Sequence, residues 1–244
     1  MIEIPIVYED DSILVISKPA GVIVNRAESV QSETLQDWAD KKIGDNYIQF
    51  QNDLSSTEFI ARSGIVHRLD KDTSGLLIIA KNPEVFIRLQ AQFKERDIDK
   101  QYLTLVHGLV VPKVGEIRAS VGRLPWNRER FGVLPGGKEA STSYSVISYY
   151  QLSANKYSYL SVFPHTGRTH QIRIHLKYIN HTVVSDEFYA GRKTCRQDKN
   201  ICPRLFLHAY KLSFTNPITN KQLNLENPLP DDLNHVLSKL SKIQ

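Results

Sequence analysis

The chain has 244 residues, of which 41% are hydrophobic and 23% are charged. This composition is typical of a globular protein and excludes a disordered chain, a collagen-like chain and a low-complexity linker. Lys and Arg number 31 against 26 Asp and Glu, and the resulting net charge of +5 permits a polyanionic partner without requiring one.

The apolar segments of the chain are all short. The longest, Ile13–Ile16 and Leu76–Ala80, fall far below the roughly 20 residues that a membrane helix needs. The N-terminus lacks a basic region followed by a long apolar one, so we expect neither a signal peptide nor membrane association. Two cysteines, Cys195 and Cys202, are too few for a disulfide framework and fit a cytoplasmic protein.

The first half of the chain alternates short apolar runs with helical patterns. Thr34 and Asn82 are residue types that cap helices, and Pro83 suits the first position of a helix. Leu76–Ala80 is a short continuous apolar run, typical of a buried strand. The predicted elements are strands at Ile6–Tyr8 and Ile13–Ile16, a turn at Lys18–Gly21, a helix over Thr34–Ile43, a loop over Asp45–Arg62, a strand at Leu76–Ala80 and a helix after Asn82.

The second half contains more strands and two basic segments. The predicted elements are a strand at Lys100–Val106, a long loop or hairpin over Arg118–Lys138, strands at Thr142–Ile147 and Tyr157–Phe163, a helix from the cap Thr169 to about Asn180, a basic loop at Arg192–Arg204, strands at Leu205–Phe214 and Leu223–Leu225, and a helix over Leu233–Ile243. Strands and helices do not alternate regularly, and no linker divides the chain. We therefore expect one α+β domain over residues 1–244 with a largely antiparallel sheet.

Three motifs suggest chemistry but are better explained as turns or chance. Gly132–Glu139 nearly fits a phosphate-binding loop, yet it ends in a Glu where a hydroxyl should bind Mg²⁺. Asp72–Gly75 resembles half of an aspartic-protease site, but the chain has no second copy. Cys195 and Cys202, with scattered histidines, are too widely spaced for a structural zinc site, so we expect no metal.

Two polar segments are stronger candidates for a functional site. His67–Gly75 places a cation and a carboxylate two residues apart at the start of a buried strand, although an ion-paired turn would look the same. His165–His175 gathers hydrogen-bond donors in the first turns of a predicted helix, where a phosphate or a carboxylate would be stabilised. A single aspartate facing several cations is typical of a functional site.

Four segments resemble one known family. His67–Leu76, Lys100–Tyr102, Thr166–His175 and Pro203–Ala209 are similar, in the same order, to motifs of the RluA-like RNA pseudouridine synthases. The opening Lys18–Gly21 also resembles the start of their catalytic domain. The resemblance implies a bent, mainly antiparallel mixed sheet with flanking helices, and it spans roughly residues 6 to 230. Many relatives carry an N-terminal S4-type RNA-binding domain, which we do not expect in this sequence.

The resemblance implies a reaction that isomerises uridine in RNA without a cofactor. Asp70 would be the catalytic carboxylate, acting either as a nucleophile at C1′ or as a base at C2′. Tyr102 would stack on the uracil and relay a proton, Arg173 would pair with Asp70, and Leu205 would line the uracil pocket. Arg68 would fill the space of an extruded base. The other residues expected to contact RNA are His67, Arg168, His170, Gln171, Arg128 and Arg130.

The partner implied is a stem-loop of ribosomal or transfer RNA, bound by a monomer. A non-catalytic RNA-binding protein on the same scaffold remains an alternative, as does a glycosidic-bond hydrolase. The hydrolase would need a second positioned carboxylate, and Asp72 is the only close candidate.

Overall fold

The computed structural model describes residues 2–47 and 56–243, and the chain divides into two compact units. The first comprises Met1–Asp99 and Lys211–Asn227, and the second comprises Lys100–Tyr210 and Pro228–Gln244. The prediction of a single domain over residues 1–244 stays a prediction.

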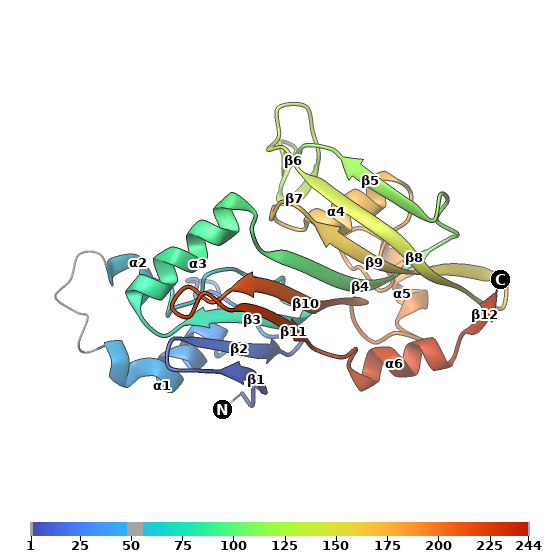
Figure 1. Cartoon of the computed structure of the whole chain (residues 1–244). Helices are drawn as coiled ribbons and strands as arrows, with labels where there is room; N and C mark the ends of the chain where they lie inside the picture. The colour runs from blue at the N-terminus through green and yellow to red at the C-terminus, as the bar shows by residue number, and fades with distance from the viewer. Residues whose placement is uncertain (1, 48–55, 244) are drawn as a thin grey trace. The chain divides into compact units, whose positions relative to one another are not determined.

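The first unit is built on strands that alternate in direction (Figure 1). Strand β2 (Ile13–Lys18) pairs with β1 (Ile6–Glu9) and with β3 (Ser74–Ala80), both antiparallel. Every residue of β3 is buried, as its continuous apolar run predicts. In the same unit, the last five residues of β10 (Leu207–Thr215) pair with β11 (Gln222–Glu226).

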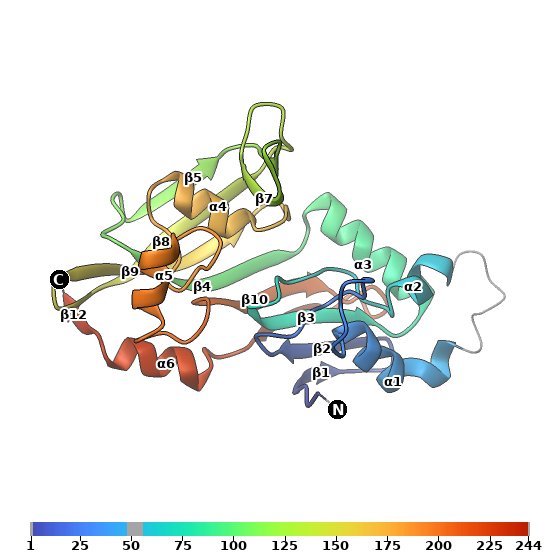
Figure 2. The same cartoon turned by 180° about the vertical axis from the view of Figure 1, so that it is seen from behind.

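Three helices belong to the first unit, α1 (Leu35–Tyr47), α2 (Thr57–Ala61) and α3 (Pro83–Glu95). Helix α1 lies on the side of β1–β3 that faces the viewer in Figure 2. Both predicted caps are confirmed, because the Thr34 hydroxyl accepts from the amide of Asp37 at 3.2 Å and the Asn82 side chain accepts from the amide of Val85 at 2.9 Å.

The loop predicted over Asp45–Arg62 is only partly correct. Helix α1 continues to Tyr47, and α2 forms around the buried side chain of Phe59. The ring of Phe59 packs edge-on against that of Phe86 in α3, at 5.9 Å between centroids. This tertiary contact stabilises a helix that its five residues would not form alone. Residues 48–55 of the predicted loop lie outside the described residues.

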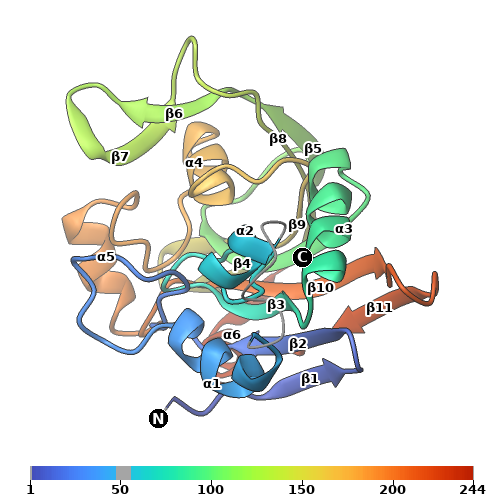
Figure 3. The ribbon, with the colours of Figure 1, turned by 90° about the vertical axis from the view of Figure 1, so that its left-hand side faces the viewer.

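The second unit is also mainly antiparallel, and the predicted α+β class is confirmed. Its strands follow the order β4 (Asp99–His107), β9 (Asn155–Pro164), β8 (Ser141–Leu152) and β12 (Ser241–Ile243). A short strand that the sequence did not reveal, β5 (Val114–Arg118), pairs with the first half of β8. The predicted hairpin is confirmed as β6 (Val121–Leu124) and β7 (Asn127–Val133), and β7 contacts helix α4 (Gln171–Tyr178) (Figure 3).

The helices of the second unit differ from the prediction at their ends. Helix α4 spans Gln171–Tyr178 and is preceded by His170 in a left-handed conformation, so the predicted cap at Thr169 is wrong. The predicted basic loop contains helix α5 (Arg192–Asp198). The C-terminal helix α6 ends at Ser238, and β12 follows it. No helix of the described ranges is long and apolar enough to cross a membrane.

Candidate active site

Asp70 lies in the turn that enters the buried strand β3. Val66 and Leu69 anchor this segment with side chains only 5% exposed, whereas Arg68 between them is exposed and Asp70 is half-buried. The amide of Thr73 donates to the carbonyl of Asp70 at 3.2 Å. The alternation of buried and exposed side chains directs Arg68 to the surface and fixes the backbone that carries Asp70.

His67 contributes to this anchoring. Its Nε2 accepts a hydrogen bond from the amide of Ile78 in β3 at 3.0 Å, and its ring lies 4.6 Å from the ring of Phe93 in α3. One ring nitrogen is thus used inside the first unit. We assign His67 a positioning role, and its predicted contact with RNA stays a prediction.

A buried lysine, Lys18, also fixes the turn that carries Asp70. Lys18 at the end of β2 is fully buried, and its ammonium donates to the carbonyls of Pro19 at 2.8 Å, Val22 at 3.0 Å and Lys71 at 3.0 Å. The amide of Gly21 donates to the same Lys71 carbonyl at 2.8 Å. An ammonium has three N–H donors, and these three carbonyls match them. The Lys18–Gly21 motif therefore fixes the peptide that follows Asp70.

The second motif is organised around Gln171, the first residue of α4. Its Oε1 accepts from the hydroxyl of Thr166 at 2.6 Å and the amide of Arg168 at 3.0 Å. Its Nε2 donates to the carbonyl of Ser141 at 3.0 Å and the hydroxyl of Thr142 at 2.9 Å. The side chain is only 4% exposed. These four bonds give Gln171 a positioning role, and its predicted contact with RNA stays a prediction.

His175 extends this network across the unit. It is fully buried, with Nε2 3.0 Å from the carbonyl of Ala119 and Nδ1 2.9 Å from the hydroxyl of Thr142. Because a carbonyl only accepts, we assign the proton to Nε2, and Nδ1 then accepts from Thr142. Burial lowers the pKa of His175 below its usual 6.5. The imidazole is therefore neutral and structural.

Arg173 is buried on α4 and has a carboxylate partner that the sequence did not reveal. Its guanidinium is 2.8 Å from Asp186 through two parallel hydrogen bonds. We predicted Arg173 to pair with Asp70, which lies in the other unit. Asp186 stands beside Glu187 between apolar residues, Val183–Val184 and Phe188–Tyr189, but nothing local distinguishes the two carboxylates or links Asp186 to Arg173.

An aromatic cluster surrounds this ion pair. The Nδ1 of His170 is 2.9 Å from the hydroxyl of Tyr189, and its ring lies 5.6 Å from that of Phe188 and 6.0 Å from that of Phe131. Phe188 is 39% exposed. The guanidinium of Arg173 lies against the rings of Phe188 and Tyr189, so a cation and aromatic faces lie together here. Such surfaces suit nucleobases and phosphates.

The remaining predicted residues are distributed through the second unit. Tyr102 lies on β4 opposite Val162, half-buried against the main core cluster, and Leu205 is a buried member of that cluster. Arg168 is half-buried, and its Nε donates to the carbonyl of Glu139 at 3.2 Å.

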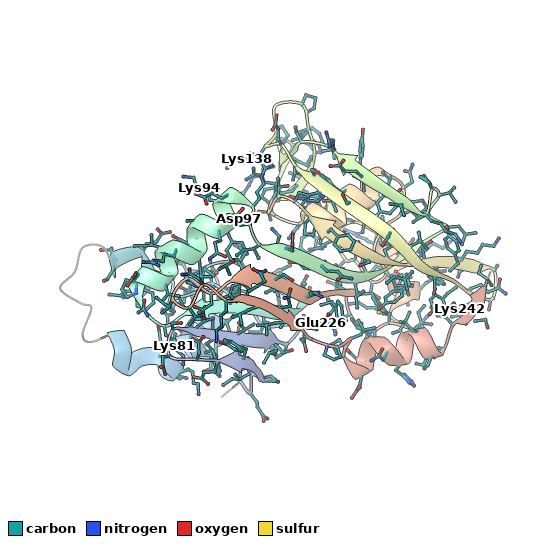
Figure 4. The ribbon with its side chains drawn as sticks, in the orientation of Figure 1. Lys81, Lys94, Asp97, Lys138, Glu226 and Lys242 are labelled. Atoms are coloured by element: carbon teal, nitrogen blue, oxygen red, sulfur yellow. The ribbon has the colours of Figure 1, made fainter. Side chains whose placement is uncertain are left out.

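The β6–β7 hairpin carries exposed cations and one large exposed aromatic ring. Arg130 is exposed, and Trp126 at the hairpin's turn is 76% exposed. The guanidinium of Arg123 lies 5.1 Å from the centre of the Phe131 ring. Lys138 pairs with Val121 at the base of the hairpin (Figure 4). Arg128 lies in β7, but its side chain is outside the described residues.

The cysteines do not form a reactive or metal-binding centre. Both are buried, and burial raises the pKa of the Cys202 thiol to about 11. Among the described residues, no group of three or more His, Cys, Asp or Glu side chains is arranged to hold a metal ion.

Residues 12–178 match the model of a protein family described as RNA pseudouridylate synthase. The chain belongs to this family. The predicted family is therefore confirmed, whereas the predicted roles of Asp70, Tyr102 and Arg173, which lie within the matched range, stay predictions.

Relatives of the family are similar over nearly the whole chain. Ribosomal large subunit pseudouridine synthase D of Neisseria meningitidis serogroup A is 38% identical over 96% of this chain and 60% of the relative. The protein of the same name from Pseudomonas aeruginosa is 37% identical over 98% of this chain and 72% of the relative. The chain thus spans less than two thirds of the Neisseria protein.

A solved structure has the same fold. Human RNA pseudouridylate synthase domain containing 1 aligns with a TM-score of 0.75 and 25% identity, over 99% of this chain and 89% of that one. The fold and the family therefore agree.

Proposed function

We propose that this chain converts one or a few uridines of a structured RNA into pseudouridine, with Asp70 as the catalytic carboxylate. The observation that carries the proposal is the family match over residues 12–178, which includes the anchored turn of Asp70. Two similar relatives are named for the large ribosomal subunit, which favours ribosomal RNA over transfer RNA as the substrate.

The proposed reaction is an isomerisation. The N1–C1′ bond of uridine breaks, the uracil turns, and a bond from C5 to C1′ forms. The proton leaves C5 and N1 gains one, so atoms and electrons balance within the substrate. No redox cofactor is needed for this balance. The chemistry instead requires an ionised carboxylate beside the ribose, which would be Asp70, attacking C1′ or removing the C2′ proton.

Tyr102 and Arg173 are the proposed partners of Asp70. The phenol ring of Tyr102 would stack on the uracil, and its hydroxyl would carry the C5 proton away. Arg173 would donate hydrogen bonds to the Asp70 carboxylate, while Leu205 would contribute an apolar wall to the uracil pocket. The buried, ion-paired Arg173 supports its role because its guanidinium is held in one orientation, and Tyr102 packs against the core while part of its surface stays exposed.

A uridine inside a stem must leave the base stack before it can react. The exposed Arg68, two residues before Asp70, is the proposed side chain that fills the vacated space. Arg130, Arg128, Arg168 and His170 would contact the RNA backbone and bases. Gln171 would act indirectly, by fixing the turn that carries Arg168 and His170.

Pseudouridine mapping tests this proposal. Total RNA from a strain lacking the gene is compared after rescue with the wild type, Asp70→Asn or Asp72→Asn. We expect one or a few sites to lose the modification and to regain it with the wild type and Asp72→Asn only. Asp72 is a matched control because it is an aspartate of the same turn. Recovery with Asp70→Asn would refute Asp70 as the catalytic group.

The purified protein provides the second arm. We expect it to form pseudouridine in unmodified ribosomal RNA that contains the lost site, without an added cofactor. Absence of activity on both ribosomal and transfer RNA, together with tight RNA binding, would favour the non-catalytic alternative.

A further inference from the structure

Asp186 is a buried carboxylate to which the proposed reaction assigns no role. It is fully buried and accepts four hydrogen bonds. Arg173 donates from Nε to Oδ2 and from Nη2 to Oδ1, both at 2.8 Å. The amides of Phe188 and Tyr189 donate to Oδ1, both at 3.0 Å. One carboxylate thus holds an arginine of α4 and the turn that follows Asp186.

Burial makes this pair obligatory. The side chain of Arg173 is 6% exposed and that of Asp186 is not exposed at all. A guanidinium cannot lose its proton, so in a buried place it needs a counter-charge. The rings of Tyr189 and Phe188 lie 5.1 Å and 5.4 Å from the guanidinium carbon. Asp186 therefore fixes both the plane of the guanidinium and the backbone that carries the two aromatic residues next to it.

We propose that Asp186 is a positioning residue that sets the direction of the Arg173 guanidinium and thereby its hydrogen bonds to the reacting centre. The inference rests on the proposed function for Arg173. A bidentate pair allows only one orientation of the guanidinium plane, because both N–H bonds must point at the two carboxylate oxygens. The other N–H groups of Arg173 are then aimed by the same contact, before any RNA binds.

The competing explanation is that Asp186 only stabilises the turn to Tyr189. The Asp186→Asn substitution separates the two roles. The amide oxygen of Asn still accepts from the backbone amides of Phe188 and Tyr189. The amide nitrogen, however, is a donor and faces the donor Nε of Arg173, so the bidentate pair is lost while the turn is kept.

The second unit offers a matched control. Asp198 is also a buried aspartate, 3% exposed, and its Oδ2 lies 3.0 Å from Nε2 of His107 and 2.9 Å from the amide of Ser185. Asp198→Asn removes a buried carboxylate with a basic partner and a backbone partner in the same unit, but it does not touch Arg173.

The first measurement follows the Nε–H signal of Arg173 by NMR in the full-length protein. The signal is assigned by its loss in Arg173→Lys. We expect slow exchange with solvent in the wild type and in Asp198→Asn, and exchange at least about tenfold faster in Asp186→Asn. An unchanged signal in Asp186→Asn would overturn the proposal. This arm does not depend on enzymatic activity.

The second measurement is a double-mutant cycle on the single-turnover rate of pseudouridine formation at saturating RNA. We expect Asp186→Asn to lower this rate by about 10²-fold, with the Kd for RNA changed by less than about threefold. In the Arg173→Lys background, Asp186→Asn should lower the single-turnover rate by less than about threefold, because the residue through which Asp186 acts is already altered. Equal losses in both backgrounds would overturn the proposal.

The two arms separate the possible failures. A wild-type protein that forms no pseudouridine refutes the proposed function, and the NMR signal then decides by itself whether Asp186 orients Arg173. An active wild type with additive losses in the cycle refutes the positioning role and leaves the proposed function intact.

Discussion

The ammonium of Lys18 donates a hydrogen bond to the carbonyl of Lys71, 3.0 Å away, and Lys71 directly follows Asp70. Two sequence motifs 53 positions apart are joined by this bond. The carbonyls of Pro19 and Val22 share the same ammonium. A lysine is costly to bury, and this one is buried where it fixes the backbone that carries the proposed catalytic carboxylate.

Lys18→Met should reduce stability and activity together. The methionine fills the same space but leaves the carbonyls of Pro19 and Val22 without this donor, and the carbonyl of Lys71 keeps only the amide of Gly21. We expect the free energy of unfolding to fall by roughly 2–4 kcal/mol, measured by urea denaturation. The rate of pseudouridine formation should fall at least about tenfold at a temperature where the variant is folded, since the turn of Asp70 loses its clamp.

Lys81→Met is the matched control for that experiment. Lys81 lies in the same unit (Figure 4) and donates to the carboxylate of Glu9 at 2.8 Å and to the carbonyl of Asp10 at 2.5 Å. Both partners of its ammonium lie in the segment Glu9–Asp10, away from the turn of Asp70 in the sequence. Its loss should cost stability, but the activity of the folded variant should stay within about twofold of the wild type. Equal loss of activity in both lysine variants would contradict the proposed clamp.

Gln171→Leu should destabilise the second unit because it removes four hydrogen bonds at once. The buried hydroxyl of Thr166 loses its acceptor, and the carbonyl of Ser141 loses one of its two donors and keeps the amide of His165. We expect a loss of roughly 2–4 kcal/mol in the free energy of unfolding. Gln101→Leu is the matched control, because Gln101 makes one such bond, to the hydroxyl of Ser161 at 2.6 Å. This substitution should lower the free energy of unfolding by about 1 kcal/mol. Similar losses of unfolding free energy in the two variants would refute the stabilising role of the four hydrogen bonds of Gln171.

The sequence predicted the elements whose signals are local. The caps at Thr34 and Asn82 and the apolar run of β3 each depend on neighbouring residues, and each is confirmed. Helix α5 was missed because it is polar, and its few residues are held by the burial of Cys195 and Asp198 in the folded unit. Strand β5 was missed because its short polar sequence is stabilised by backbone pairing with β8.

In the candidate site, too, the sequence predicted the features with local signals and missed those that depend on tertiary contacts. Asp70 and Arg173 were found from their motifs, but the motifs do not reveal which residues hold them. Lys18 and Asp186 are linked to them by contacts between distant segments, and such contacts carry no local pattern. The helix cap at Thr169 was predicted wrongly because the network of Gln171 places His170 at the helix start, with a left-handed backbone that no cap preference indicates.

His175 should make the stability of the protein depend on pH below neutrality. Its pKa in the folded state is lowered by burial, whereas the unfolded chain has the usual value of 6.5. As the pH falls through 6.5, His175 becomes protonated in the unfolded chain but stays neutral in the folded protein. The free energy of unfolding therefore decreases as the pH falls below this value. Urea denaturation between pH 7.5 and 5 measures this change as a falling free energy of unfolding.

Two histidine variants test the assignment. In His175→Gln the free energy of unfolding is lower at every pH, but its fall between pH 7.5 and 5 should be shallower than in the wild type. His235→Gln removes an exposed histidine of α6 and should leave the fall unchanged. A wild-type slope in His175→Gln would show that other groups are responsible.

Tyr102→Phe should slow the reaction without weakening RNA binding. The substitution keeps the ring that would stack on uracil and removes only the hydroxyl that would carry the C5 proton. We expect the single-turnover rate to fall by about 10²–10⁴-fold, with an unchanged Kd for RNA. Tyr144→Phe removes a hydroxyl from another buried tyrosine of the unit, 7% exposed, and should keep the wild-type rate. A wild-type rate in Tyr102→Phe would exclude the proton relay.

Arg130→Ala should weaken RNA binding through the phosphate backbone alone. Arg130 is exposed on the β6–β7 hairpin, so its loss leaves the core intact. Each cation that neutralises a phosphate releases a counterion, and the slope of log K against log salt should become shallower by about 0.7–0.9. Filter binding or fluorescence anisotropy at several salt concentrations measures the slope. Arg88→Ala, on α3 and paired with Glu84, is the control and should keep the wild-type slope. A wild-type slope in Arg130→Ala would place the RNA backbone away from the hairpin.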